Sequence, residues 1–316
     1  MNGPASARVV VVVPAHNEEA TISACLDSIS SSVTELGRTW PGVRVVTVVV
    51  ADACTDRTEE LAIAADVRVA RISAESVGVA RRIGVEVARE LIEGDHPDDW
   101  IASTDADSRV PPAWLSEGMR HIAGGADLVI GTVRPDFSAL PYEYEAWWHR
   151  THPPGRPNGH VHGANLGIRT SSYRAVDGFG TEKTGEDVGL VERLRRTPVR
   201  ETHTDGAEVI TSARLIGRAP GGYSRYLAAQ LSAVHDPAVP FRPSAGWPET
   251  DTRRHSTTSD LDPDERREEL LRAPKPDEKD AAPRITVGRN SKGGKRIDIA
   301  DTAVVRPGRG SSADGD

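Results

Sequence analysis

Two short runs of apolar, mostly β-branched residues constrain the fold of this chain more than any other feature. They are RVVVVVP at Arg8–Pro14 and RVVTVVVAD at Arg44–Asp52. A continuous apolar run of this length is typical of a strand buried on both faces of a parallel sheet. The sequence therefore predicts two central strands of an α/β domain.

Segments with helical spacing separate the predicted strands. Between the first two, apolar residues recur on one helix face, at Ala20, Ile22, Cys25, Leu26, Ile29, Val33 and Leu36. Further strands are predicted at 67–72 and 98–104, and further helices at 55–66 and 75–93. This alternation predicts a mostly parallel, Rossmann-like sheet that helices flank on both faces.

The second half of the chain is less regular, and its composition changes after residue 235. Strands are predicted at 126–134, at about 164–169 and at 207–215, and helices at 113–123, 141–150, 170–179, 186–197 and 221–234. From residue 236 onward Pro, Asp, Arg, Ser and Gly dominate, and apolar residues are too few to offset the entropy of ordering. We therefore expect one domain at 1–235 and a low-complexity, disordered tail at 236–316.

Composition and charge exclude several classes of protein. The formal net charge is −8, whereas a general nucleic-acid binder needs a basic surface, so no nucleic-acid partner is expected. The two cysteines, Cys25 and Cys54, have neither metal-binding spacing nor the number that a disulfide framework needs. No apolar segment has the length of a transmembrane helix, and we expect a soluble, cytoplasmic protein.

Polar and acidic residues follow three of the predicted strands directly. PAHNEE follows the first strand, ADACTDRT the second and STDADS the fourth. Ligands of open parallel sheets bind at the carboxyl ends of the strands, which lie at one edge of the sheet. The sequence therefore predicts a functional site at this edge.

Asp105 and Asp107 form a D-x-D pair that is either a metal-binding site or part of a solvated turn. In an extended segment their carboxylates point to the same side, and burying both without a cation is costly. A Mg²⁺ or Mn²⁺ ion, bound by one or two carboxylates and by substrate phosphates, would relieve the repulsion. The alternative is a solvated turn in which Asp107 or Ser108 caps the next helix.

The other acidic positions also leave alternatives open. Asp52 suits either a hydrogen bond to a ribose or base, or an Asx turn. Asn17, Glu18 and Glu19 suit the first turn of a helix, where acids interact favourably with the helix dipole. Glu186 and Asp187 suit a helix N-terminus as well, or one of them acts as a general base near an acceptor hydroxyl.

Six motifs in order resemble the family 2 glycosyltransferases of the GT-A fold over about residues 8–232. They are VVVPAHNEEATISACLDSI, VVVADACTDRT, GVARRIGVEVA, STDADSRVPPAWL, HGANLGIRTSSYRAVDGF and GEDVGLVERL. The resemblance implies an inverting enzyme that moves a sugar from a nucleoside-diphosphate sugar to a hydroxyl acceptor of unknown identity. It favours a UDP-sugar over a GDP-sugar as donor, with Mg²⁺ or Mn²⁺ as cofactor.

The resemblance also implies a role for each matching residue. The expected nucleotide and donor contacts are Pro14, Ala15, Asn17, Glu18, Asp52, Arg81 and Asp105. Asp107 matches the metal-binding aspartate of the D-x-D, with Asp105 facing both ribose and metal. The expected sugar and acceptor contacts are Gly163, Ala164, Asn165 and Glu186, and Asp187 matches the catalytic base.

Some positions depart from the family pattern. The usual D-D-G-S-x-D after the second strand reads A-D-A-C-T-D at 51–56, which weakens the inference about the base. The Q-x-x-R-W of processive synthases is missing after Asp187, so a non-processive enzyme is expected. Ser212, Arg214 and Arg218 are candidate contacts to the diphosphate or to an anionic acceptor, whereas spacing assigns no role to His160 and His162.

Two other functions remain open. A sugar-phosphate nucleotidyltransferase has a related fold, but it needs a Gly-rich basic loop after the first strand, where this chain has PAHNEEA. A catalytically silent nucleotide-sugar-binding protein is the second alternative. It does not explain why all the expected acids are present.

Overall fold

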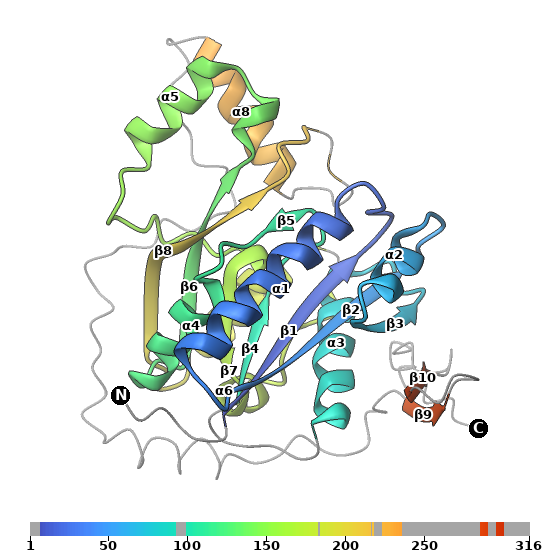
Figure 1. The fold of residues 1–316 in the computed structure, drawn as a ribbon. Coiled ribbons are helices and arrows are strands. Elements are labelled where there is room, and N and C mark those ends of the chain that lie inside the picture. Colours follow the sequence, from blue (N-terminus) through green and yellow to red (C-terminus); the bar gives the residue numbers. More distant parts are fainter. Residues whose placement is uncertain are drawn as a thin grey trace, which may run out of the picture.

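The computed structural model describes residues 7–92, 99–182, 184–215, 217, 223–235, 285–289 and 295–299. Within these residues the main feature is a sheet with the strand order β3-β2-β1-β4-β7-β6-β8-β5 (Figure 1). Helices cover both of its faces. The α/β class predicted from the alternating pattern is therefore confirmed.

The first half of the sheet is parallel, as predicted. β1 (Arg8–Ala15) pairs in parallel with β2 (Arg44–Asp52) and β4 (Trp100–Ser103), and β2 pairs in parallel with β3 (Arg68–Ile72). The carboxyl ends of these strands therefore lie at the same edge of the sheet.

The second half contains two strands that run against the others. β6 (Leu128–Pro135) and β8 (Glu201–Thr211) are parallel to each other, but β7 (Leu166–Arg169) is antiparallel to both β4 and β6. The two-residue β5 (Ser108–Arg109) is antiparallel to β8. The sheet is thus mostly parallel, with β7 inserted between its two parallel parts.

The apolar run of β1 contributes to two hydrophobic cores. Val9, Val11 and Val13 pack with α1 (Ile22–Thr39), α2 (Thr58–Ala64) and α4 (Trp114–Ala123) on one face. Val10 and Val12 pack with α3 (Val77–Leu91), α6 (Thr170–Ala175) and α7 (Glu186–Leu194) on the other. Successive strand residues point to opposite faces, so a strand that is covered on both must be apolar throughout.

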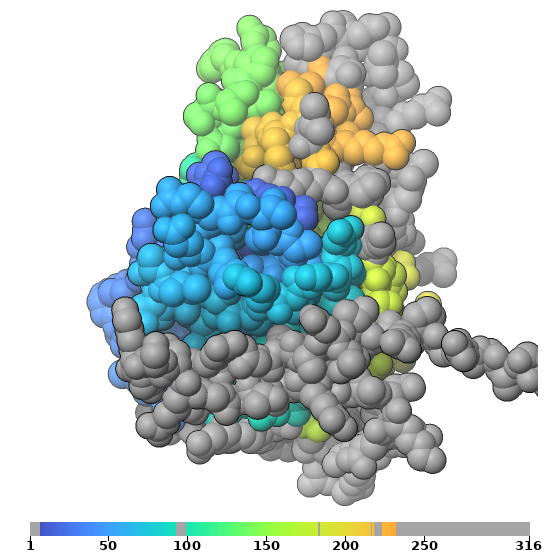
Figure 2. All heavy atoms as spheres, turned by 90° about the vertical axis from the view of Figure 1, so that its right-hand side faces the viewer, coloured from blue at the N-terminus to red at the C-terminus, as the bar shows by residue number. Residues whose placement is uncertain are grey.

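A third apolar cluster lies beyond the edge where β6 and β8 end. There α5 (Tyr142–Thr151) packs against α8 (Tyr223–His235), and the buried residues include Tyr144, Trp148 and Leu227. Figures 1 and 2 show these two helices as a layer beyond the body of the sheet. We call this layer the α5–α8 module. Its helices were predicted at 141–150 and 221–234, close to their observed bounds.

Several element boundaries differ from the predictions. α1 begins at Ile22, because residues 17–21 form a turn in which Asn17 has a left-handed φ of 53°. Asn17, Glu18 and Glu19 therefore precede the helix rather than open it. β8 begins at Glu201 instead of 207, since its early residues pair with β6 although they are polar.

Part of the predicted tail is structured. β9 (Ile285–Arg289) and β10 (Lys295–Ile299) form an antiparallel pair that was not predicted. The rest of 236–316 lies outside the described residues. Among the residues that the structure describes, no helix is long and apolar enough to cross a membrane.

Candidate active site

Asp52 ends β2, and its carboxylate organises the loop before α3. One oxygen accepts hydrogen bonds from the backbone N–H groups of Ala74 and Glu75 at 2.7 and 2.9 Å, and the other accepts from Ser76 N–H at 2.9 Å. The side chain is buried. Asp52 therefore has a structural function at the strand edge, and its predicted contact with a nucleotide stays a prediction.

The turn after β1 connects to the loop after β2 through Asn17. Its side-chain oxygen accepts hydrogen bonds from the N–H groups of Thr55 and Asp56 at 2.7 and 3.3 Å. Cys54 donates its thiol to the carbonyl of Ala15, the last residue of β1, at 3.3 Å. These contacts hold Pro14, Ala15 and the two loops together at the predicted nucleotide-binding edge.

Arg81 on α3 connects the D-x-D pair to the start of α7. Its guanidinium donates to the carboxylates of Asp105 and Glu186, and only 3% of its side chain is exposed. A Cβ at Gly163 would lie 2.3–2.5 Å from the Arg81 guanidinium atoms. A side chain at the glycine of the GAN loop (Gly163–Asn165) would therefore force the Arg81 guanidinium to move.

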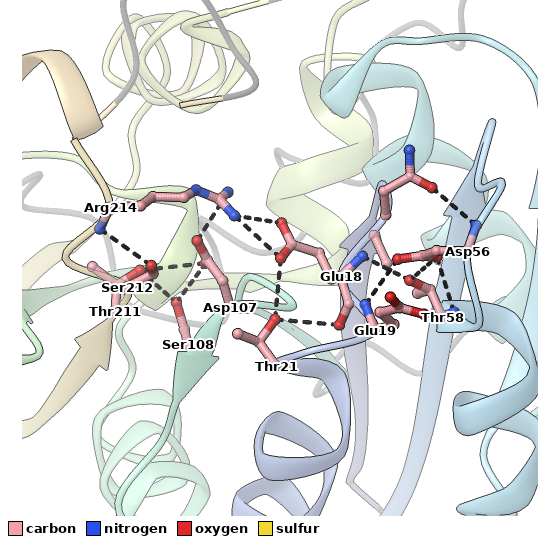
Figure 3. Close-up of polar contacts among 12 residues, drawn as sticks. Glu18, Glu19, Thr21, Asp56, Thr58, Asp107, Ser108, Thr211, Ser212 and Arg214 are labelled. Atoms are coloured by element: carbon pink, nitrogen blue, oxygen red, sulfur yellow. Dashed lines mark hydrogen bonds and ion pairs between the residues drawn. The ribbon is translucent and has the colours of Figure 1, made fainter. Parts of the chain in front are cut away.

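Arg214 makes a second ionic bridge, between the loop after β1 and the D-x-D pair. Its guanidinium lies 2.9 and 3.2 Å from the two carboxylate oxygens of Glu18 and 3.0 Å from Oδ2 of Asp107. Figure 3 shows Arg214 reaching from the segment after β8 toward both acids. The hydroxyl groups of Ser108 and Thr211 each lie 3.4 Å from Oδ1 of Asp107.

Asp187 lies in the first turn of α7, next to the ion pair of Glu186. Oδ2 accepts from Gly163 N–H at 2.7 Å and Oδ1 accepts from Val188 N–H at 2.8 Å. Burial raises the pKa of Asp187 above its ordinary value, while the charge of Arg81 acts in the opposite direction. The result is an oriented, half-buried carboxylate with increased proton affinity.

Negative charge exceeds positive charge in this cluster. The guanidinium groups of Arg81 and Arg214 provide the positive charge. The negative charge comes from the carboxylates of Glu18, Asp105, Asp107, Glu186 and Asp187. Burial, with the charge of Asp105, raises the pKa of Asp107 to about 6. A bound cation would lower this electrostatic cost.

The donor set fits a hard divalent cation. Asp105 and Asp107 provide carboxylate oxygens, but no three acidic, histidine or cysteine side chains converge on one metal position among the described residues. Mg²⁺ and Mn²⁺ prefer oxygen ligands, and Mg²⁺ commonly binds one or two carboxylates together with substrate phosphates. The residues present therefore fit such an ion with a phosphate-bearing ligand.

The GAN loop does not contribute all of its side chains to the site. The amide of Asn165 is buried, where it donates to the carbonyls of Thr132 and Ala207 at 2.8 and 3.0 Å and accepts from Trp114 Nε1 at 2.9 Å. It therefore holds β6, β8 and α4 together. Ala164 is buried in the core below, so Gly163 is the member of the loop in contact with Arg81 and Asp187.

The remaining candidates lie around the same edge. Ser212 donates its backbone N–H to the carbonyl of Asp107 at 3.1 Å, and its hydroxyl accepts from Arg214 N–H at 3.3 Å. His160 and His162 stack edge-on against Tyr226 and Tyr223 of the α5–α8 module. Arg218 lies outside the described residues.

Three contributors to the site were not predicted. Phe179 lies under the guanidinium of Arg81 at 5.8 Å, Ser76 fixes Asp52, and Thr211 lies beside Asp107. Phe179 ends the motif HGANLGIRTSSYRAVDGF, whereas no motif marks Ser76 or Thr211. Thr211 lies within the strand predicted at 207–215, and its place beside Asp107 depends on the pairing of β8 with β5, which local pattern does not identify.

Comparisons with known proteins identify the family of this chain. The profile described as glycosyl transferase family 2 matches residues 10–179, which is more than half of the chain. A search of curated proteins returned no match.

Among solved structures, the chain is similar to S. aureus TarS 1–349 in complex with UDP, with 15% identity over 76% of this chain and 74% of that one and a TM-score of 0.48. It is also similar to glucosyl-3-phosphoglycerate synthase from Mycobacterium tuberculosis in complex with Mn²⁺, UDP and glucosyl-3-phosphoglycerate. That match has 20% identity over 72% and 79% of the two chains and a TM-score of 0.43. On the evidence of the family match, the chain belongs to glycosyl transferase family 2 and is a glycosyltransferase.

Proposed function

We propose that this enzyme transfers a sugar from a nucleoside-diphosphate sugar to a hydroxyl acceptor with inversion at the anomeric carbon. The observation that carries the proposal is the position of Asp187, an oriented carboxylate with a raised pKa beside the D-x-D cluster. A general base works best when its pKa is close to the working pH, and burial moves Asp187 in that direction.

In the proposed reaction, Asp187 accepts the proton of the acceptor hydroxyl while that oxygen forms a bond to the anomeric carbon. The bond from this carbon to the diphosphate oxygen breaks, and the nucleoside diphosphate leaves with the electron pair. Gly163 N–H and Val188 N–H hold the base in position. A single displacement from the opposite face inverts the configuration.

The proposed donor is a UDP-sugar, with a GDP-sugar as the second choice. Pro14, Ala15, Asn17, Glu18 and Asp52 surround its nucleotide in this proposal. Mg²⁺ or Mn²⁺ would be held by Asp107 and Asp105, and when bound it supplies positive charge against the leaving diphosphate. Arg214 already lies at Asp107 and adds a cation from the chain itself.

The test is release of nucleoside diphosphate from a panel of UDP- and GDP-sugars with Mn²⁺, with water or added hydroxyl compounds as acceptors. Asp187→Asn should reduce release by at least about 10²-fold, the range of general-base contributions, and leave UDP affinity within about twofold. Donor binding without any release, by the wild-type enzyme with all acceptors, would instead favour a silent nucleotide-sugar binder. Full activity of Asp187→Asn would reject the base assignment.

A further inference from the structure

Arg214 forms an ion pair with Asp107, the residue expected to bind the metal ion. The two acids that it bridges come from distant segments, since Glu18 follows β1 and lies 196 residues before Arg214. Figure 3 shows one guanidinium contacting both carboxylates. In this state Asp107 already has a cation of the chain beside it, which it shares with Glu18.

A divalent ion and this guanidinium compete for the same carboxylate. Arg214 contacts Oδ2 of Asp107 at 3.0 Å, while the other oxygen lies beside the hydroxyls of Ser108 and Thr211. An ion that binds Asp107 must therefore displace Arg214 or share the carboxylate with a like charge. Either event weakens binding of the ion alone.

The two arginines of the cluster differ in their freedom to move. Each arginine bridges two carboxylates, but only 3% of the Arg81 side chain is exposed, whereas 33% of the Arg214 side chain is exposed. The backbone of Arg214 is anchored, because its N–H donates to Ser212 Oγ at 3.3 Å. Of these two guanidinium groups, that of Arg214 is therefore the more exposed to solvent, while its backbone is held in place.

A diphosphate offers this guanidinium a new partner. Arginine binds phosphate oxygens through two parallel hydrogen bonds, and such charge-assisted bonds are among the strong ones in proteins. We propose that Arg214 couples the two ligands of the site: it opposes divalent-ion binding to Asp107 in the free enzyme and then binds the diphosphate that arrives with the ion. The inference rests on the proposed function.

The coupling has opposite consequences for the two ligands when Arg214 is changed. In Arg214→Gln, Asp107 loses its competing cation, so Mn²⁺ alone should bind about tenfold more tightly. The same variant loses its phosphate contact, so UDP should bind about tenfold more weakly in the presence of saturating Mn²⁺. A tenfold change in each affinity lies within the usual range of coupling between two binding sites. The coupling is reciprocal, because each ligand changes the affinity for the other by the same factor.

The experiment is isothermal titration calorimetry of the full-length protein with Mn²⁺ alone, and with UDP or GDP at saturating Mn²⁺. Arg109→Gln is the matched control, because it removes the same charge from an exposed pair with Asp136. It should leave both affinities unchanged. Arg214→Lys keeps the competing charge but not the planar fork, so it should restore the wild-type affinity for Mn²⁺ and bind UDP more weakly.

Two outcomes overturn the inference. One is an equal affinity of wild type and Arg214→Gln for Mn²⁺ alone, and the other is a fall of both affinities in a variant whose circular dichroism shows that it is folded. A wild-type protein that binds Mn²⁺ but neither nucleotide contradicts the proposed function and the diphosphate half of the coupling. In that case the Mn²⁺ comparison between variants still decides whether Arg214 competes at Asp107.

Discussion

Arg81 and Glu186 form an ion pair in which both side chains are almost completely buried, although 105 residues separate them in the sequence. The pair joins α3 to the first turn of α7, where Asp187 lies. The same guanidinium also contacts Asp105. One side chain therefore links Asp105 of the D-x-D pair to the helix turn that contains the proposed base.

Removal of Arg81 should destabilise the fold strongly. Arg81→Met leaves Glu186 buried without a counter-charge, which typically costs about 3–5 kcal/mol in the free energy of unfolding. The double variant Arg81→Met/Glu186→Met should recover much of this loss, because no unpaired charge remains between the helices. Urea unfolding at pH 7, followed by circular dichroism, measures the wild type, the single variants Arg81→Met and Glu186→Met, and the double variant.

The control for this prediction is Arg82→Met, on the same helix. Arg82 is 30% exposed, pairs with the exposed Asp177 and donates to the carbonyls of Phe179 and Asp177, so its loss leaves no buried charge unpaired and should cost less than the loss of Arg81. A double variant that loses the sum of the two single effects would contradict a direct Arg81–Glu186 interaction.

Asp52 should contribute to stability even without a nucleotide. In Asp52→Asn one carboxylate oxygen becomes an N–H₂ group, so at least one of the three backbone donors at 74–76 loses its acceptor. A buried donor without a partner costs about 1–3 kcal/mol. Hydrogen exchange should show faster exchange at 74–76, and urea unfolding should show the lower stability.

Asp66→Asn provides the comparison for Asp52. Asp66 is exposed and has a left-handed φ of 57°, a conformation that asparagine tolerates well, so stability should not change. If Asp52→Asn weakened nucleotide binding but left unfolding and exchange unchanged, the carboxylate would have a purely ligand-binding role.

The pH dependence of sugar transfer should reflect the raised pKa of Asp187. The base works only when ionised, so activity is present above its folded-state pKa and is lost as the pH falls through it. Because burial raises this pKa above 3.8, the acid limb of kcat/KM should lie at higher pH than for an ordinary aspartate. A limb at or below 3.8 would contradict the prediction.

The profile should be measured at saturating Mn²⁺. Burial raises the pKa of Asp107 to about 6, and a bound cation favours its ionised form, which leaves Asp187 to define the limb. Circular dichroism at each pH separates loss of activity from unfolding. The Asp66→Asn protein should give the wild-type profile.

Local pattern predicted much of the sheet but not its full order. The runs in β1 and β2 are apolar at successive positions because both faces of these strands are covered, and this is visible from the sequence. The antiparallel insertion of β7 and the early start of β8 were not predicted. Both depend on pairing with β6, a partner that local propensity does not identify.

The sequence by itself determined that acids collect at one edge of a mostly parallel sheet, because strand ends are marked by local composition. It also placed Asp105, Asp107 and Asp187 in the motifs of a glycosyltransferase. Only the tertiary structure decided which charges meet: Arg81 with Glu186, and Arg214 with both Glu18 and Asp107. These pairs join segments about 100 to 200 residues apart, and their energies come from burial and geometry, which exist only once the chain has folded.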